Sequence, residues 1–197
     1  IISGNITGNN PTGPGYLSFL ASKGFIQSQF SLSGFGVDVS DDGVDNGTAS
    51  PLNPALYELG NISNPDRLVY VRREPGGAGE IRGCFGHGNL NTHIVAGYND
   101  LTGFPHEDAQ LFNYNLGVCP FCRTGNSVVF DPNFTNPDYE DLQSRAYNDG
   151  MRLSTNSWGA NVGGAYNSDS QRYDALVRDA QPTGSAIPAA GNQEMVI

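Results

Sequence analysis

The chain has 197 residues, of which 38% are hydrophobic and 10% aromatic, and this is enough for one globular domain with a sizeable core. Its formal net charge is −10 at pH 7. Nucleic acids and anionic membranes are also negatively charged and would repel the protein, which argues against either as a partner. No run of about 18 apolar residues is present, so the sequence predicts no membrane-spanning helix. We expect a single domain over residues 1–197.

The first half of the chain predicts one helix and two strands. Residues 15–24 have helical apolar spacing and end on a glycine. Residues 36–45 predict a strand that runs into an acidic turn, and residues 67–71 predict a second strand. The acidic turn carries Asp41, Asp42 and Asp45. Such an oxygen-rich turn also suits calcium, so a structural calcium site is an alternative use of these carboxylates.

Residues 86–97, GHGNLNTHIVAG, predict a reactive histidine at the start of a helix. Glycines flank His87, so the backbone can turn tightly there and a substrate can approach closely. An aspartate at the end of a strand, such as Asp41, can orient this ring. His93 is an alternative base, but the flanking glycines favour His87. The two histidines are six residues apart on a helix and diverge by roughly 120°, so they do not predict a metal site.

The second half alternates strands with helices. Strands are predicted at 127–131 and 151–158, and helices at 139–148 and 169–180. This alternation predicts an α/β fold with a doubly wound, mostly parallel sheet and helices on both faces. Right-handed crossovers place the carboxyl ends of all strands at one edge, where Asp41 and His87 can meet.

Three cysteines are present, and two of them form a Cys-x-x-Cys pair, Cys119 and Cys122. No second such pair follows, and the motif precedes a predicted strand rather than a helix. Small buried side chains are therefore the favoured interpretation, with redox or metal chemistry as the alternative.

Three motifs carry a family resemblance. Residues 40–45 resemble the Asp-Ser/Thr-Gly strand end of the subtilisin-like serine proteases, and residues 86–97 resemble their Gly-His-Gly-Thr-His-Val-Ala-Gly helix start. Residues 154–159 resemble the Asn-x-Ser-x-Gly strand that pairs with substrate. The motifs occur in the family's order. The resemblance implies that Asp41 and His87 are members of the catalytic triad and that Ser157, Trp158 and Gly159 bind substrate.

The chain departs from the family pattern in two places. Residues 89–91 are extra, which adds nearly one helical turn after His87. The Gly-Thr-Ser segment that holds the family's nucleophile is absent from residues 1–197.

Asn192 resembles the oxyanion-binding asparagine, but Pro188 precedes it where a central strand is expected. A second such asparagine after Ile197 is the alternative.

The resemblance implies a serine endopeptidase that hydrolyses peptide bonds through an Asp-His-Ser triad. Because the serine is missing, we expect this chain alone to be inactive and to need the remaining part of the peptidase domain after Ile197. The family's chemistry requires no cofactor, its substrates are proteins or peptides, and the expected location is secreted or extracellular. The alternative is a non-catalytic pseudoprotease, or peptide-binding module, that keeps only the substrate strand.

Overall fold

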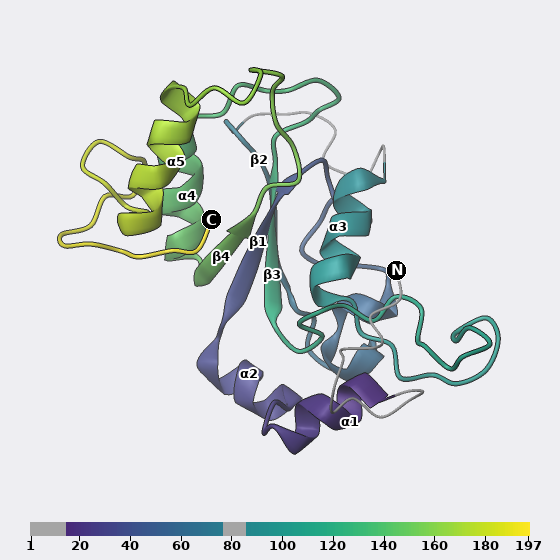
Figure 1. Ribbon diagram of the computed structural model, residues 1–197. Helices are drawn as coiled ribbons and strands as arrows, with labels where there is room; N and C mark the ends of the chain where they lie inside the picture. Colours follow the sequence, from purple (N-terminus) through teal and green to yellow (C-terminus); the bar gives the residue numbers. More distant parts are fainter. Residues whose placement is uncertain (1–14, 77–85) are drawn as a thin grey trace.

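The computed structural model describes residues 15–76 and 86–197, which form a parallel sheet with helices on both faces (Figure 1). The strands are β1 (Gly36–Asp41), β2 (Leu68–Arg73), β3 (Arg123–Val128) and β4 (Met151–Thr155). They are hydrogen-bonded in the order β2-β3-β1-β4, and every pairing is parallel. The chain thus places strands on both sides of β1, with β3 inserted between β1 and β2, and this arrangement confirms the predicted doubly wound α/β class.

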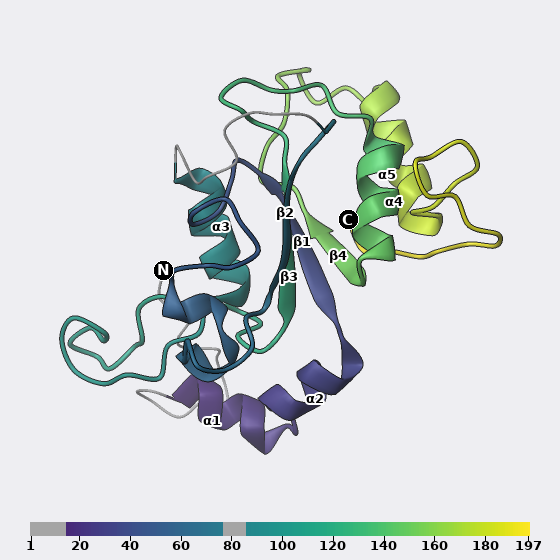
Figure 2. The same cartoon turned by 180° about the vertical axis from the view of Figure 1, so that it is seen from behind.

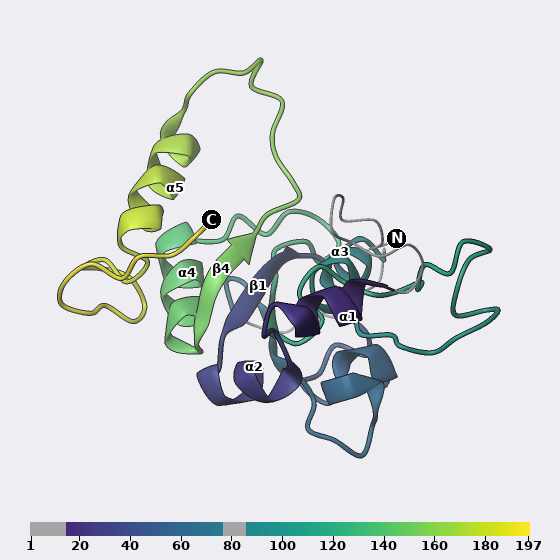
Figure 3. The same ribbon diagram turned by 60° about the horizontal axis from the view of Figure 1, so that its bottom comes forward.

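Helices cover both faces of the sheet. One face carries α3 (His87–Ala96), and the opposite face carries α4 (Tyr139–Asn148) and α5 (Ser168–Arg178), as two opposite views show (Figures 1 and 2). Two short helices, α1 (Gly15–Ser22) and α2 (Gln27–Ser33), lie near the amino end of β1 (Figure 3). The 3-10 turns η1 (Pro54–Leu56) and η2 (Glu58–Gly60) lie in the long β1–β2 connection. Among the described helices, none has the length and apolar character needed to cross a membrane.

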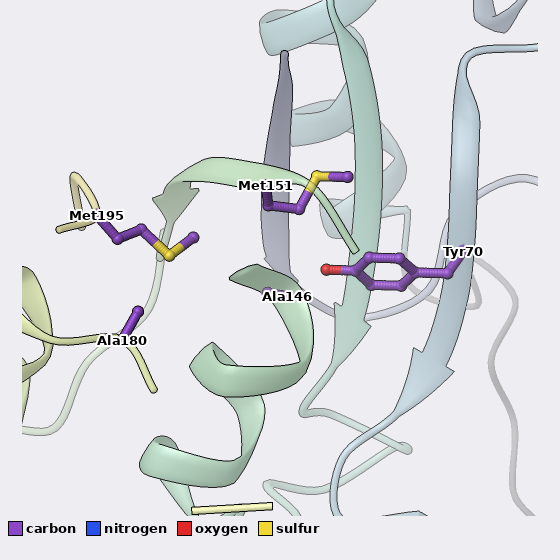
Figure 4. Packing of buried hydrophobic residues seen from close by; sticks show 5 residues of the cluster. All are labelled: Tyr70, Ala146, Met151, Ala180 and Met195. Atoms are coloured by element: carbon purple, nitrogen blue, oxygen red, sulfur yellow. The ribbon is translucent and has the colours of Figure 1, made fainter. Parts of the chain in front are cut away.

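The core lies on both sides of the sheet because side chains alternate along each strand. On the side of α4, a cluster forms from residues of β2, α4 and β4 and of the segments after α5 (Figure 4): Tyr70, Ala146, Met151, Ala180 and Met195. The Tyr70 ring lies over Gly125 of β3, where an added Cβ would come within 2.3 Å of the ring. On the side of α3, a second cluster joins Val37, Ala96 and Cys122.

The bounds of β3 and β4 differ most from the prediction. β3 begins at Arg123 rather than 127, and its first residues are polar although Thr124 and Asn126 are fully buried. They are buried because β3 lies between β1 and β2, and the Asn126 amide donates to the Val39 carbonyl at 3.0 Å. β4 ends at Thr155, so residues 156–158 leave the sheet instead of extending it.

The last described residues pair with the free edge of β4. Val196 forms a parallel bridge with Leu153, in which the Ser154 N–H donates to the Val196 carbonyl at 2.7 Å. The Val196 N–H in turn donates to the Arg152 carbonyl at 3.1 Å. Residues around Val196 therefore occupy a fifth position in the sheet, next to β4.

Candidate active site

Asp41 is the last residue of β1, at the sheet edge where ligands bind in open α/β sheets. Its side chain is only 3% exposed. The Asp42 N–H donates to Oδ1 at 2.8 Å, and the Asn91 amide donates to Oδ2 at 2.8 Å. These two donors fix the orientation of the carboxylate, so that Oδ1 also faces the imidazole of His87.

His87 is the first residue of α3, and its Nδ1 lies 2.7 Å from Asp41 Oδ1. The ring is 54% exposed, in contrast to the buried carboxylate. Because a carboxylate only accepts hydrogen bonds, Nδ1 carries the proton in the neutral ring, and Nε2 is left as the basic nitrogen. The hydrogen bond to Asp41 and the negative charge of Asp41 raise the pKa of His87 above its usual value.

The start of α3 is held against the acidic turn by Asp42. Gly86, which precedes the helix, has φ = 76° and offers no side chain as a cap. The carboxylate of Asp42 takes this role by accepting the Gly88 N–H, one of the donors that a helix start leaves unpaired. An added Cβ at Gly88 would lie 2.2 Å from the Asp42 carbonyl oxygen, so only glycine permits this close approach. The Gly-His-Gly pattern therefore sets the distance between His87 and Asp41.

Asn91 is a site residue that the motif comparison missed. It lies one helical turn after His87, within the three extra residues, and its Nδ2 is 2.8 Å from Asp41 Oδ2 and 3.3 Å from His87 Nδ1. Asn89, from the same insertion, accepts the Asp45 N–H at 3.2 Å. The helix absorbs the insertion as one continuous element, as expected from its length. An i, i+4 spacing from His87 was the signal that could have identified Asn91.

Residues 157–159 follow β4 and pass close to the end of β1. The Trp158 indole N–H donates to the Ser40 carbonyl at 3.0 Å, next to Asp41. Its ring stacks on Tyr139 at a centroid distance of 6.1 Å and meets Phe130 edge-on. Ser157 and Gly159, on either side of Trp158, are exposed. A cavity of about 800 Å³ opens alongside and is lined by Trp158, Tyr139, Tyr173 and Asn156 among others.

The Subtilase family model matches residues 33–196, which include every element from β1 to the Val196 bridge. The chain belongs to the subtilase family. This membership supports a serine peptidase kind of function. A search of curated proteins found no match to the chain.

At the candidate site, His87 is the histidine that contacts the Asp41 carboxylate. His93, the alternative base, lies farther along α3 and is buried, and its Nε2 is 3.4 Å from Asn53 Nδ2 rather than near Asp41. Burial lowers the pKa of His93, which disfavours the protonated form that a general base must adopt. The structure therefore brings His87 and not His93 to the carboxylate.

The structure does not bring Asn192, the predicted oxyanion donor, to this candidate site. Asn192 is exposed and precedes the Val196 bridge, and the next residue, Gln193, accepts the Ala180 N–H at 2.8 Å through its carbonyl. Because Val196 pairs in parallel with β4, the preceding residues lie toward the amino end of that strand. Asp41 lies at the carboxyl end. Pro188 and the chain around it form a surface loop, and the strand begins only after Asn192.

The carboxylates of the acidic turn have partners within the chain. Asp41 binds His87 and Asn91, Asp42 accepts the Gly88 N–H, and Asp45 accepts the Asn53 N–H at 3.0 Å. Within residues 15–76 and 86–197, no group of three or more His, Cys, Asp and Glu side chains is placed to hold a metal ion. The turn therefore serves as a hydrogen-bonded anchor for α3 and for the η1 region.

Proposed function

We propose that this protein is a serine endopeptidase in which His87 is the general base and Asp41 orients it. The observation that carries the proposal is the 2.7 Å contact between His87 Nδ1 and the buried Asp41 carboxylate, with the rest of the ring exposed. Nε2 would take the proton of a serine hydroxyl as the serine attacks the peptide carbonyl, and would later return it to the leaving amine. Asp41 would hold the required tautomer and stabilise the imidazolium.

The serine itself would come from outside residues 1–197. Among the described residues, no serine hydroxyl hydrogen-bonds to the His87 ring, which contacts Asp41 and Asn91. We place the nucleophile and the oxyanion asparagine in the remaining part of the peptidase domain after Ile197. The strand that starts around Val196 would lead into that part, and an asparagine after its end would lie at the same sheet edge as Asp41. The chain alone would then be inactive.

Asn91 would act as a positioning residue. Its amide holds the Asp41 oxygen that does not face His87, so it would prevent the carboxylate from rotating away during turnover. Since the base and its orienting carboxylate work as one unit, loss of this donor would affect turnover without removing either catalytic side chain.

The substrate would bind as an extended strand along Ser157, Trp158 and Gly159. Ser157 and Gly159 are exposed, while Trp158 is held by the Ser40 carbonyl, so this backbone is presented on a fixed support. Main-chain hydrogen bonds give such strand addition its affinity, and adjacent pockets take alternate side chains. The aromatic cavity beside Trp158 would supply one of these pockets.

A non-catalytic peptide-binding module is the second candidate, favoured by the same exposed segment at 157–159 and by the lack of a described serine at His87. A fluorophosphonate probe on protein from its native source separates the two. The peptidase proposal expects a label on a serine outside residues 1–197, and an Asp41→Asn or His87→Ala protein should lose that label. Intact, folded protein that takes no label but still binds extended peptides would support the module.

Secretion and a structural calcium ion stay predictions. Recovery of the protein outside the cells that make it would check the first. A melting temperature that rises with added calcium and falls again with a chelator would check the second.

A further inference from the structure

Cys119 and Cys122 lie in a tight turn just before β3. The Cys122 N–H donates to the Cys119 carbonyl at 3.2 Å, and the Cys122 thiol approaches the same oxygen at 3.1 Å. A hydrogen-bonded turn of four residues keeps its first and last Cα atoms within about 7 Å. Disulfides span Cα distances of about 4.4–6.8 Å, so this backbone can accept a Cys119–Cys122 bond with little movement.

The two thiols differ in access to solvent. Cys122 is fully buried beside Val37 and Ala96, whereas Cys119 is only partly buried. An external reagent can therefore reach Cys119 first, and Cys122 lies behind it as a second thiol. This is the arrangement of an attacking and a resolving cysteine, in which one thiol reacts with a partner and the other displaces it.

A buried cation lies next to the pair. The guanidinium of Arg67 is 1% exposed, and within the described part of the chain it makes no ion pair with a carboxylate. It donates instead to backbone carbonyls, including that of Cys122 at 2.8 Å and that of Ala96 at 2.7 Å. A positive charge held in the interior favours a thiolate over a thiol nearby.

The environment favours ionisation of the Cys119 thiol. A hydrogen bond from the Cys122 thiol, together with the charge of Arg67, lowers the pKa of Cys119. The favoured interpretation from sequence, two small buried side chains, therefore describes the burial of Cys122 but not the access and the lowered pKa of Cys119. These two residues do not make a metal site, because the described part of the chain places no third ligand beside the two sulfurs.

We propose that Cys119 and Cys122 form a redox-active dithiol that exchanges with a disulfide-containing partner. The Cys119 thiolate attacks one sulfur of the partner disulfide, whose S–S bond breaks, and one partner thiolate leaves. Cys122 then attacks the Cys119 sulfur, the bond between Cys119 and the partner breaks, and the departing partner sulfur takes up the Cys122 proton and leaves as a thiol. The two cysteines are oxidised by two electrons, and the partner disulfide is reduced to two thiols.

The position of the turn connects this chemistry to the fold. The Cys119 N–H donates to the Val95 carbonyl at 2.7 Å, and the Gly117 N–H donates to the Gly97 carbonyl at 2.7 Å. The dithiol is therefore fastened to the carboxyl end of α3, the helix that begins with His87.

Incubation of the full chain with oxidised and reduced glutathione, followed by alkylation and peptide mass spectrometry, tests the proposal. We expect loss of both thiols and a Cys119–Cys122 disulfide in the folded protein, with Cys84 followed separately on its own peptide. Two free thiols after incubation in excess oxidised glutathione would overturn the proposal, and this measurement needs no variant.

Two variants test the assigned order of attack. Cys122→Ser should trap one glutathione on Cys119, because no resolving thiol remains. Cys119→Ser should leave Cys122 unmodified while the protein is folded and reactive after unfolding in urea. Equal reaction of the two single variants in the folded protein, checked by circular dichroism, would refute the order of attack and with it the site.

Discussion

Gly88→Ala gives the sharpest test of how the site is built. In most helices this change is favourable, because alanine is preferred over glycine by up to about 1 kcal/mol. Here the new Cβ would lie 2.2 Å from the Asp42 carbonyl oxygen and 2.5 Å from its Oδ1, where ordinary contact begins at 3.4 Å. The helix start and the acidic turn must therefore move apart by about 1 Å.

The structure predicts that the clash outweighs the helix preference. The obstructing atom is a backbone oxygen that cannot rotate away, and overpacking of this kind costs about 1–3 kcal/mol. We expect a net loss of stability of about 1–2 kcal/mol. The same displacement would lengthen the contact between His87 and Asp41, and in the complete enzyme a misplacement of about 1 Å can cost about 100-fold in turnover.

Urea unfolding of the purified chain measures the first effect, and proton NMR of the His87 Nδ1–H that faces Asp41 measures the second. Gly76→Ala is the matched control, because the added Cβ there meets nothing within 4 Å. A Gly88→Ala protein as stable as the parent, with an unchanged His87 proton signal, would refute the argument that glycine sets this distance.

Four further predictions concern single side chains. Asp41→Asn should lower the pKa of His87, because the hydrogen bond and charge that raise it are weakened, and an NMR titration of the ring that shows no shift would contradict the pairing. Asn91→Ala should alter the His87 Nδ1–H signal and the pH profile of turnover while the far-UV circular dichroism stays the same; loss of turnover with both readouts unmoved would show a role elsewhere. Burial raises the pKa of Asp38 from 3.8 to about 6, despite hydrogen bonds from Tyr70, Ser127 and Ser154, so its folded form binds a proton that the unfolded chain has already lost. Stability should therefore fall as pH rises from about 4 to about 6, and Asp38→Asn should remove this slope and add on the order of 3 kcal/mol at pH 7, as pH-dependent urea unfolding would reveal. Arg67→Lys should cost about 2–4 kcal/mol, because a lysine cannot reach all four carbonyls that the guanidinium binds, whereas the exposed Arg178→Lys should change stability by less than about 0.5 kcal/mol in the same assay.

The sequence by itself determined the class of the fold and the pair of residues at its centre. The spacing of apolar residues distinguishes helices from strands, and the alternation of the two along the chain specifies an α/β fold. The helix α4 was predicted at its observed bounds. Asp41 and His87 were recognisable because each lies in a short sequence motif. The strand end around Asp41 and the glycines that flank His87 require particular residue types at fixed positions. The start of β3 could not be predicted from apolar spacing, because its buried residues are polar and form their hydrogen bonds with neighbouring strands.

Only the tertiary structure decided which residues surround that pair. Asn91 reaches Asp41 from a helix that is distant in sequence, and Asn192 lies away from the site because the strand next to β4 begins after it rather than before it. Arg67 and Cys122, which the chain separates widely, become neighbours when β2 and β3 pair. Contacts of this kind depend on strand order and register, and these are set by the packing of the whole sheet rather than by any short stretch of residues.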